Sequence, residues 1–307
     1  MTRQLVIRLL LALPTAAGVV LVVFAFIHAI PGDPVDVMLG ENARAADREE
    51  LRSALGLDQP LGAQLARFAA GITHGDLGRS LTTGESVAGL IAARYPATLE
   101  LAGAAVVVAA AIALPLGTLA AALPGSWADR AALGLAVGGA SLPTFWLGPM
   151  LILCFAVRTD WFPVSGHDGL ASLVLPATTL GVGMAAVLTQ QLRGSLLGVL
   201  RRDFIRTARA KGLPPRAVFM RHALRNAATA VVTVFGLQIG GLLAGSIITE
   251  TIFAWPGLGR LLVQAINSRD YPLVQGCVLS IALTYVLVNL LTDLVHVALD
   301  PRLRRTP

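Results

Sequence analysis

Six long stretches of this sequence contain no aspartate, glutamate, lysine or arginine. Each has 22 or more residues, and they cover residues 9–32, 101–128, 131–157, 169–192, 226–249 and 271–292. A hydrocarbon core of about 30 Å is crossed by roughly 20 apolar residues in a helix, so each stretch is long enough to span a bilayer. One such stretch could be a buried helix of a soluble protein. Six in one chain predict an all-α integral membrane protein with six transmembrane helices.

The composition agrees with a membrane location. Only 14% of the residues are charged, against roughly 25% in ordinary globular domains, and the mean hydropathy is +0.71. The first apolar stretch runs from Leu9 to Ile30, longer than the roughly 7–15-residue core of a signal peptide. No small-x-small cleavage site precedes the polar PGDP at 31–34. We therefore expect this stretch to be retained as the first span.

The two cysteines, Cys154 and Cys277, lie inside apolar stretches. Neither is part of a CxxC motif or of a cluster of cysteine and histidine residues. This pattern does not predict a metal site. Cysteine behaves as a small hydrophobe in protein interiors, so we expect both to be buried.

Positive charge is distributed unevenly between the segments that join the spans. With a cytoplasmic N-terminus, the inner side holds Arg3, Arg8, Arg130, Arg193, eight residues of 201–225 and the three arginines of the tail. The short outer loops then hold only Arg158, Arg260 and Arg269. Long outer segments cross regardless of charge, so the positive-inside rule predicts N-in and C-in. The net charge of +6 does not indicate nucleic-acid binding, because aromatic residues are not interleaved with the basic ones.

The segment between the first two spans is too well patterned for disorder. It is either a plain loop or an external contact surface, and its length favours the contact surface. Asn42 is expected to cap a helix over 43–55, and a second helix is expected near 61–72. GDLGRSL at 75–81 is expected to run along the membrane surface, as part of an external contact surface. Near the C-terminal end, a Pro-Gly turn precedes an expected amphipathic helix over 258–266 at the same outer surface.

The predicted division of the chain has four parts. They are an N-terminal tail and first span (1–30), an extracytoplasmic segment (31–97), a five-helix core (98–299) and a cytoplasmic tail (300–307). The core contains a cytoplasmic loop at 199–226. Its later spans are expected at about 172–197, 227–248 and 273–298.

RRDFIRTARAKGLPPRAVFMRHALR, residues 201–225, concentrates eight Lys/Arg and the single acid Asp203. Three apolar residues, Phe204, Ile205 and Ala208, share one face of an expected helix over 201–211. Gly212 is a natural helix stop, and Pro214-Pro215 suits the start of a second helix. An ordinary inner loop would also be basic. However, residues 124–131 make an inner turn in eight residues, so the longer ordered loop indicates a docking surface.

TARAKGL (207–213) and RHALRNA (221–227) resemble the cytoplasmic loop of permease subunits of ATP-binding-cassette (ABC) importers, in the dipeptide/oligopeptide/nickel branch. The resemblance extends over nearly the whole chain. Further matching motifs, in order, are IPGDP (30–34), GDLGRSL (75–81), LPTFWLG (142–148), FPVSG (162–166), TETIFAWPGLGRLL (249–262), RDYPLVQG (269–276) and LDPRLR (299–304). The resemblance implies a type I ABC importer-like permease fold.

The general importer signature begins Glu-Ala-Ala and has a glycine four residues later. Here Arg206, Thr207 and Ala208 occupy the first three positions, and only Ala208 and Gly212 match literally. Arg-Thr-Ala is the form associated with the peptide branch. Arg225 stands where the general signature often has proline.

The resemblance implies a coupling helix that is seated in a groove of an ATPase subunit. The implied coupling residues are Asp203, Phe204, Ile205, Arg206, Thr207, Ala208, Arg209, Ala210, Lys211 and Gly212. Phe204, Ile205 and Ala208 would form an apolar seat. Arg206, Arg209 and Lys211 would meet acidic or carbonyl groups at the rim, and Gly212 would allow close approach.

The implied partners are a second homologous permease, two ABC ATPases and an extracytoplasmic solute-binding protein, in a bacterial or archaeal cell membrane. Candidate contacts with the binding protein are Asp76, Arg79, Trp255, Arg260 and Arg269. The implied cargo is a dipeptide or short oligopeptide, with nickel chelates, glutathione and sugars as alternatives.

The chain itself is expected to be non-catalytic. Its only lysine, Lys211, precedes its glycine, so no GxxxxGK[ST] loop is present, and ATP and magnesium are expected in the partner subunits. HExxH and GxSxG are absent, which argues against an intramembrane enzyme. A proton-coupled transporter usually carries ionisable residues in its spans, whereas here only His28 lies in one. A sodium symporter and a channel remain open alternatives.

The translocation path is expected to involve polar side chains within the spans. Candidates are Gln190, Gln238, Thr284 and Asn289, with Gln191 beside the first. Hydrogen bonding between helices is an equally good explanation of these residues. Glu250 and Asp293 are expected to be end caps or interface residues.

Overall fold

The computed structural model describes residues 2–29, 35, 44–55 and 57–299. The described part is helical, with one isolated β-bridge between Arg79 and Ser86. The helices are α1 (Thr2–Ala29), α3 (Ala45–Leu55), α4 (Leu61–Thr73), α5 (Val87–Ala122), α6 (Trp127–Ser141), α7 (Thr144–Leu151), η1 (Ile152–Val157), α8 (Leu170–Leu200), α9 (Asp203–Ala210), α10 (Pro215–Ala217), η2 (Val218–Leu224), α11 (Arg225–Ile252), α12 (Leu258–Asn267) and α13 (Tyr271–Leu299). The IPGDP motif, the Asn42 cap and the tail 300–307 lie outside the described residues.

Three helices, α5, α8 and α13, are long and apolar enough to cross a membrane. Two bent pairs raise the number of candidate spans to five: α6 with the segment Thr144–Val157, and the two parts Val231–Leu242 and Ser246–Ile252 of α11. The first expected span corresponds to α1, in which Leu10–Ala25 is a shorter apolar helix. The described residues thus support three to five spans, and the total of six stays a prediction.

Small residues bring the central helices close together. Gly181 of α8 lies against α5, where an added Cβ would be 2.8 Å from Val108 Cγ1. Gly240 of α11 lies against α13, where an added Cβ would be 2.6 Å from the Tyr285 ring. In a membrane the hydrophobic effect does not drive helices together, because lipid tails are as apolar as the side chains. Close backbone approach of this kind therefore stabilises helix pairs through van der Waals packing. The core is therefore centred on α5, α8 and α11.

Two elements differ from the sequence-based expectation. Helix α5 begins at Val87, within the segment assigned to the outer loop, because Ser86 caps it by accepting a hydrogen bond from the Gly89 amide. The third span is broken by a 103° bend between Ser141 and Thr144. Pro143 explains the bend, since a residue before proline disfavours the helical conformation, and Leu142 is extended.

The cysteines also differ from each other. Cys277 is buried as expected, whereas Cys154, on η1, is exposed. The expectation for Cys154 was wrong because an apolar stretch does not show which side of a helix packs against the chain.

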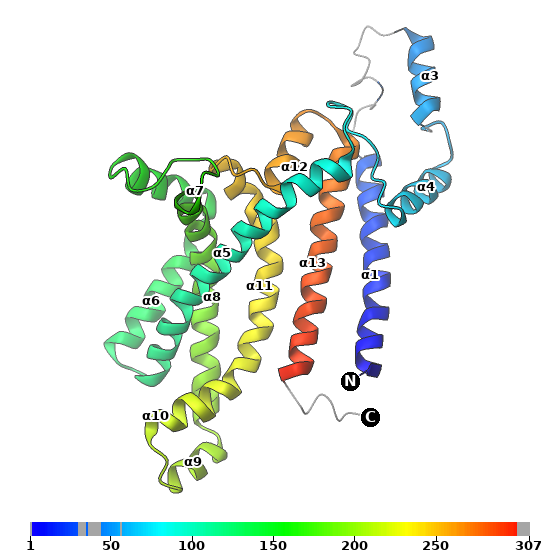
Figure 1. The fold of residues 1–307 in the computed structure, drawn as a ribbon. Helices are drawn as coiled ribbons and strands as arrows, with labels where there is room; N and C mark the ends of the chain where they lie inside the picture. Colours follow the sequence, from blue (N-terminus) through cyan, green and yellow to red (C-terminus); the bar gives the residue numbers. More distant parts are fainter. Residues whose placement is uncertain (1, 30–34, 36–43, 56, 300–307) are drawn as a thin grey trace.

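Figure 1 shows that α9 and α10 lie at the same end of the bundle as the start of α1 and the end of α13. Helices α3, α4 and α12 lie at the opposite end. The basic loop and the segment 44–83 are therefore separated by the full length of the bundle.

Candidate functional site

The basic loop forms a compact knob of α9, α10 and η2 (residues 201–224). We call it the cytoplasmic knob, after the side of the membrane that the sequence predicts for it. Helix α9 ends in a Schellman motif at Gly212, which has a φ of +76°. The Gly212 amide donates to the Arg209 carbonyl at 2.9 Å, and the Leu213 amide donates to the Ala208 carbonyl at 3.4 Å. Pro215 then opens α10. The expected helix, glycine stop and proline start are confirmed.

The apolar face of α9 packs against this chain and is not offered to a partner. Ile205 and Ala208 are buried in a cluster with Leu192, Leu196 and Val218. The expectation that both residues form part of an apolar seat for the ATPase was wrong. An eight-residue helix needs its apolar face to hold it on the bundle, because a short isolated helix is unstable in water.

The outer side of the knob combines a small apolar centre with a basic rim. Phe204 remains 39% exposed, and Leu213 and Met220 are the other exposed large apolar side chains of the knob. The exposed basic side chains are Arg201, Arg202, Arg206, Arg209, Lys211, Arg216 and Arg221. Thr207 and Ala210 are also exposed, and the Thr207 hydroxyl donates to the Asp203 carbonyl.

An ion pair between neighbouring turns lies within this rim. Arg206 Nη1 lies 3.6 Å from Asp203 Oδ1, and the two side chains are 79% and 95% exposed. Such an exposed pair contributes little to stability and is easily exchanged. The knob therefore suits a partner surface that supplies acidic or carbonyl groups.

At the opposite end, Trp255 does not form a contact surface. It is 0% exposed, its Nε1–H donates to the Ala97 carbonyl at 2.8 Å, and the His167 ring packs edge-on at 4.4 Å. The expectation of a receptor contact at Trp255 was wrong. A buried indole needs an acceptor for its N–H, and the carbonyl on α5 provides it.

Glu250 is buried at the end of α11 and caps the start of α12. Its Oε2 accepts a hydrogen bond from the Arg260 amide at 3.0 Å, and its Oε1 accepts one from Thr98 Oγ1 at 2.9 Å. Thr98 Oγ1 in turn accepts from the Leu258 amide at 2.7 Å. The carboxylate thus joins α5, α11 and the positive end of the α12 dipole. The expected end-cap role is confirmed, although the capped helix is α12.

Arg260 is only half exposed, because its guanidinium turns back to the Ala254 carbonyl at 2.6 Å. Arg269, Asp76 and Arg79 are exposed. Asp76 accepts from the Gly78 amide at 2.9 Å, and Arg79 donates to the Gly84 carbonyl at 3.1 Å. Three of the five residues predicted to contact the binding protein are therefore exposed.

Asp270 fastens the segment 75–83 to the turn before α13. Its Oδ2 accepts hydrogen bonds from Ser80 Oγ at 2.5 Å and from Thr82 Oγ1 at 2.8 Å. Burial raises the pKa of the Asp270 carboxyl, but hydrogen bonds from Ser80, Thr82 and two backbone amides outweigh it and hold the pKa below its ordinary value. Arg79 and Arg269, the chain neighbours of Ser80 and Asp270, therefore lie on connected segments.

The four predicted path residues have different environments. Thr284 is buried, and its hydroxyl donates to the Ser280 carbonyl at 2.6 Å. Because this hydroxyl has one proton, the Tyr95 hydroxyl is the donor in the 2.5 Å hydrogen bond between the two side chains. This geometry favours hydrogen bonding between helices for Thr284. Gln190 is exposed, and Gln238 and Asn289 are half-buried.

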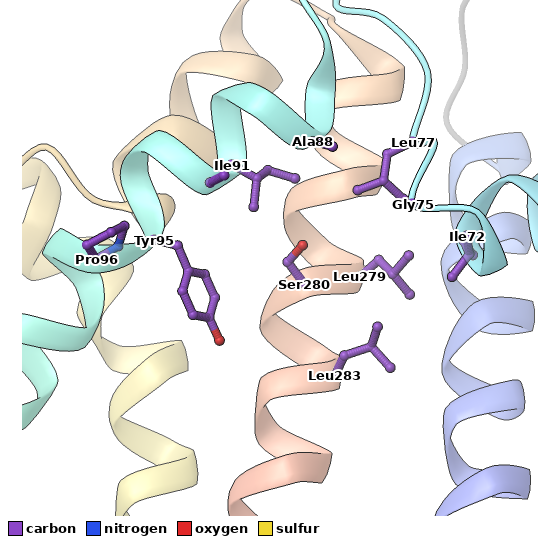
Figure 2. Close-up of a pocket in the computed structure, with 11 residues that line it drawn as sticks. Ile72, Gly75, Leu77, Ala88, Ile91, Tyr95, Pro96, Leu279, Ser280 and Leu283 are labelled. Carbon is purple, nitrogen blue, oxygen red and sulfur yellow. The ribbon is translucent and has the colours of Figure 1, made fainter.

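A cavity of about 520 Å³ lies beside Tyr95, between the segment after α4, the start of α5 and α13. Figure 2 shows Tyr95, Ile91 and Leu283 on its walls. The lining is mainly aliphatic, and Ser280 and Tyr95 contribute its polar side chains.

Two protein-family models together match almost the whole chain. The family described as "Binding-protein-dependent transport system inner membrane component" matches residues 113–305, and its N-terminal companion, "Binding-prot-dependent transport system membrane comp, N-term", matches residues 1–102. The chain belongs to this family. The matched region 113–305 includes the cytoplasmic knob, and the matched region 1–102 includes the segment 75–83.

Several curated relatives of this permease cover almost all of it. The "Dipeptide transport system permease protein DppB" of Escherichia coli (strain K12) is 45% identical, and the "Di/tripeptide transport system permease protein DppB" of Pseudomonas aeruginosa is 43% identical. The "Glutathione transport system permease protein GsiC" of Pectobacterium atrosepticum is also 43% identical. Each comparison covers 97% of both chains. The resemblance stated from the motifs is confirmed.

A solved structure agrees on the fold. An inward-facing structure of the MetNI methionine ABC transporter has a TM-score of 0.59 with 19% sequence identity, and the match covers 69% of this permease and 96% of that chain. The permease thus has the type I ABC importer fold. Asp129, Arg193 and Asp270 emerge as organising residues that the sequence analysis did not single out for these roles, since their partners lie far away in the chain.

Proposed function

We propose that this permease is one of two membrane subunits of an ATP-driven importer of peptide-like solutes. The cytoplasmic knob carries the proposal: its inner face is fixed to the bundle by Ile205 and Ala208, and its outer face leaves Phe204 and the basic rim accessible. Relatives named for dipeptides, di/tripeptides and glutathione support a short peptide as cargo.

The proposed topology has six spans with both termini in the cytoplasm of a bacterial or archaeal cell. Two observations support it. The knob, the start of α1 and the end of α13 lie at one end of the bundle. Most arginines outside the segment 31–100 also belong to the two termini and to the loops predicted to lie at that end, as the positive-inside rule requires.

The proposed complex contains a second, homologous permease, two ABC ATPases that bind ATP and magnesium, and an external solute-binding protein. The binding protein would meet the outer face at Asp76, Arg79 and Arg269, which are exposed on segments joined through Asp270. The two permeases would enclose the path between them. Gln190, Gln238 and Asn289 stay candidates for its lining, because each retains some exposure in this chain.

The proposed mechanism begins when the ATPases close on ATP and move their grooves. Phe204 would sit in the groove, and Arg206, Arg209 and Lys211 would pair with groups at its rim. Because Ile205 and Ala208 are packed against Leu192 and Leu196, α8 would move together with α9. Packed helices switch between discrete arrangements, which suits an inward–outward transition.

Gly212→Asp tests the coupling role, with Gly212→Asn as a matched control. Both side chains tolerate a positive φ better than most, and the space around Gly212 is open, so the two variants differ mainly in charge. The measurement is the ATPase rate of the reconstituted four-subunit complex, with and without binding protein loaded with dialanine. We expect Gly212→Asp to lose most of the stimulation by binding protein, and Gly212→Asn to keep it. Wild-type assembly, ATPase and uptake in Gly212→Asp would contradict the coupling role.

A further inference from the structure

An ion pair joins two helices at the inner end of the bundle. Arg193 of α8 forms a two-bond fork with Asp129 of α6: Nε lies 2.5 Å from Oδ1, and Nη2 lies 2.8 Å from Oδ2. The Gly125 amide also donates to Oδ2 at 2.9 Å. The side chain of Asp129 is 4% exposed and that of Arg193 is 24% exposed, so the pair is largely shielded from water. A bidentate pair fixes the direction of approach as well as the distance.

On α8, Arg193 lies next to the buried cluster that holds the cytoplasmic knob on the bundle. Leu192, the neighbour of Arg193, lies with Leu196 in the same buried cluster as Ile205 and Ala208 of α9. Ala121 at the end of α5 contributes to the same cluster. Helix η2 contacts both α8 and α9, so we expect a displacement of α9 to reach the part of α8 that carries Arg193 through this cluster.

The α6 side leads to the opposite end of the bundle. Helix α6 continues through the 103° bend into α7, where Gly148 lies against Phe253, at the end of α11. An added Cβ at Gly148 would be 3.3 Å from the Phe253 ring, so the contact is close. Phe253 precedes the turn that holds buried Trp255 and the start of α12.

We infer that the Asp129–Arg193 pair is a positioning link that carries movement of the cytoplasmic knob from α8 to α6, and through α7 to the outer end of α11. The inference rests on the proposed function. Removing one partner would leave a buried charge without its counterpart, so separating the two helices here is costly. Further from the ion pair, α6 contacts α8 through apolar residues such as Gly139 and Val182. Apolar contacts do not fix the direction of approach, whereas the bidentate ion pair does.

The test uses the complete importer: this permease, its partner permease, both ATPases and binding protein loaded with dialanine. The variants are Asp129→Asn and Arg193→Gln, each of which removes one charge. Arg130→Gln is the matched control, because Arg130 lies in the same turn and is exposed, and its guanidinium donates to the Gly125 carbonyl. The readout is the ratio of stimulated to basal ATPase, which a purely structural contact would not change in assembled complexes.

We expect both charge-removing variants to keep their basal ATPase and to lose stimulation by roughly fivefold or more, the lower range of allosteric coupling. Arg130→Gln should match the wild type. If both variants fail to assemble, Arg193→Lys decides, since lysine keeps the charge and gives up the fork. A reduced ratio in Arg193→Lys would then support the link.

A wild-type ratio in assembled Asp129→Asn and Arg193→Gln complexes would overturn this inference and leave the proposed function intact. If these two variants do not assemble, a wild-type ratio in Arg193→Lys would do the same. Gly212→Asp is included as an internal reference. If the wild-type complex is not stimulated by binding protein, or if Gly212→Asp behaves like the wild type, the proposed function falls and this inference falls with it.

Discussion

At the scale of single residues, the outer end of the bundle depends on a glycine that faces a buried carboxylate. An added Cβ at Gly257 would lie 2.4 Å from Cδ of Glu250, closer than atoms can approach without movement. Glu250 cannot easily shift, because Thr98 and the Arg260 amide hold its two oxygens. The glycine in the Pro-Gly turn is therefore required by close approach, and its φ of −97° is one that any residue adopts.

Gly257→Ala should destabilise the permease by about 1–3 kcal/mol, the usual cost of overpacking. Gly183→Ala in α8 is the matched control, since nothing lies within 4 Å of its added Cβ. The measurement is the thermal unfolding midpoint of the purified complex in detergent. A lowered midpoint is expected for Gly257→Ala alone; equal midpoints for both variants would show that Glu250 is not held against this glycine.

At the scale of elements, Asp270 fastens the segment 75–83 to the turn between α12 and α13. Its partners Ser80 and Thr82 lie 190 and 188 residues away in the chain. The segment and the residues that follow it to Ser86 form a hairpin, which is shaped by Gly78 and Gly84, both at positive φ, and by the bridge between Arg79 and Ser86. This hairpin is therefore fastened to the turn before α13 by one carboxylate.

Asp270→Asn should loosen this hairpin, because the amide is a weaker acceptor than the carboxylate for the Ser80 and Thr82 hydroxyls. Trypsin cleavage after exposed Arg79, followed by mass spectrometry, measures the change. Cleavage should be faster in Asp270→Asn, whereas Asp58→Asn, at an exposed site before α4, should cleave at the wild-type rate. Equal rates in all three proteins would contradict the role of Asp270.

The same carboxylate makes the hairpin sensitive to acid. The native pKa of Asp270 lies below its ordinary value of 3.8, so its ionised form stabilises the folded state above pH 3.8. This contribution is lost as the pH falls below 3.8 and through the lowered native pKa. Hydrogen exchange at the Thr82 amide, which donates to Asp270, should therefore lose protection in that window in the wild type. Protection that is independent of pH down to the point of global unfolding would argue against this linkage.

At the scale of the whole molecule, the two ends of the bundle differ in what they expose. One end carries the basic knob, and the other carries α12 and the hairpin. A single cysteine at Arg209 and another at Ser268 probe these two ends, in a background without Cys154 and Cys277. Both positions are exposed.

We expect an impermeant maleimide to label Ser268→Cys in intact cells, and to label Arg209→Cys only after the membrane is opened. This pattern follows from a cytoplasmic knob and six spans. Labelling of Arg209→Cys in intact cells would reverse the proposed orientation.

The sequence alone determined the features that depend on local chemistry. Uncharged stretches of sufficient length predict helices in a bilayer whatever their neighbours are, and α5, α8 and α13 match three of them. The α9 helix, its Gly212 stop and the proline start of α10 also follow from neighbouring residues. The family resemblance rested on short motifs of the same local kind.

Only the tertiary structure decided which side chains face inward and which distant residues meet. The periodicity of α9 marked Phe204, Ile205 and Ala208 as one apolar face. It could not show that α8 and η2 cover Ile205 and Ala208 and leave Phe204 exposed. Trp255 looked like a contact residue until Ala97, 158 residues away, proved to accept its N–H. Asp129 and Arg193 are separated by 64 residues. Such pairings depend on how the helices pack, because no spacing in the chain encodes a partner on another helix.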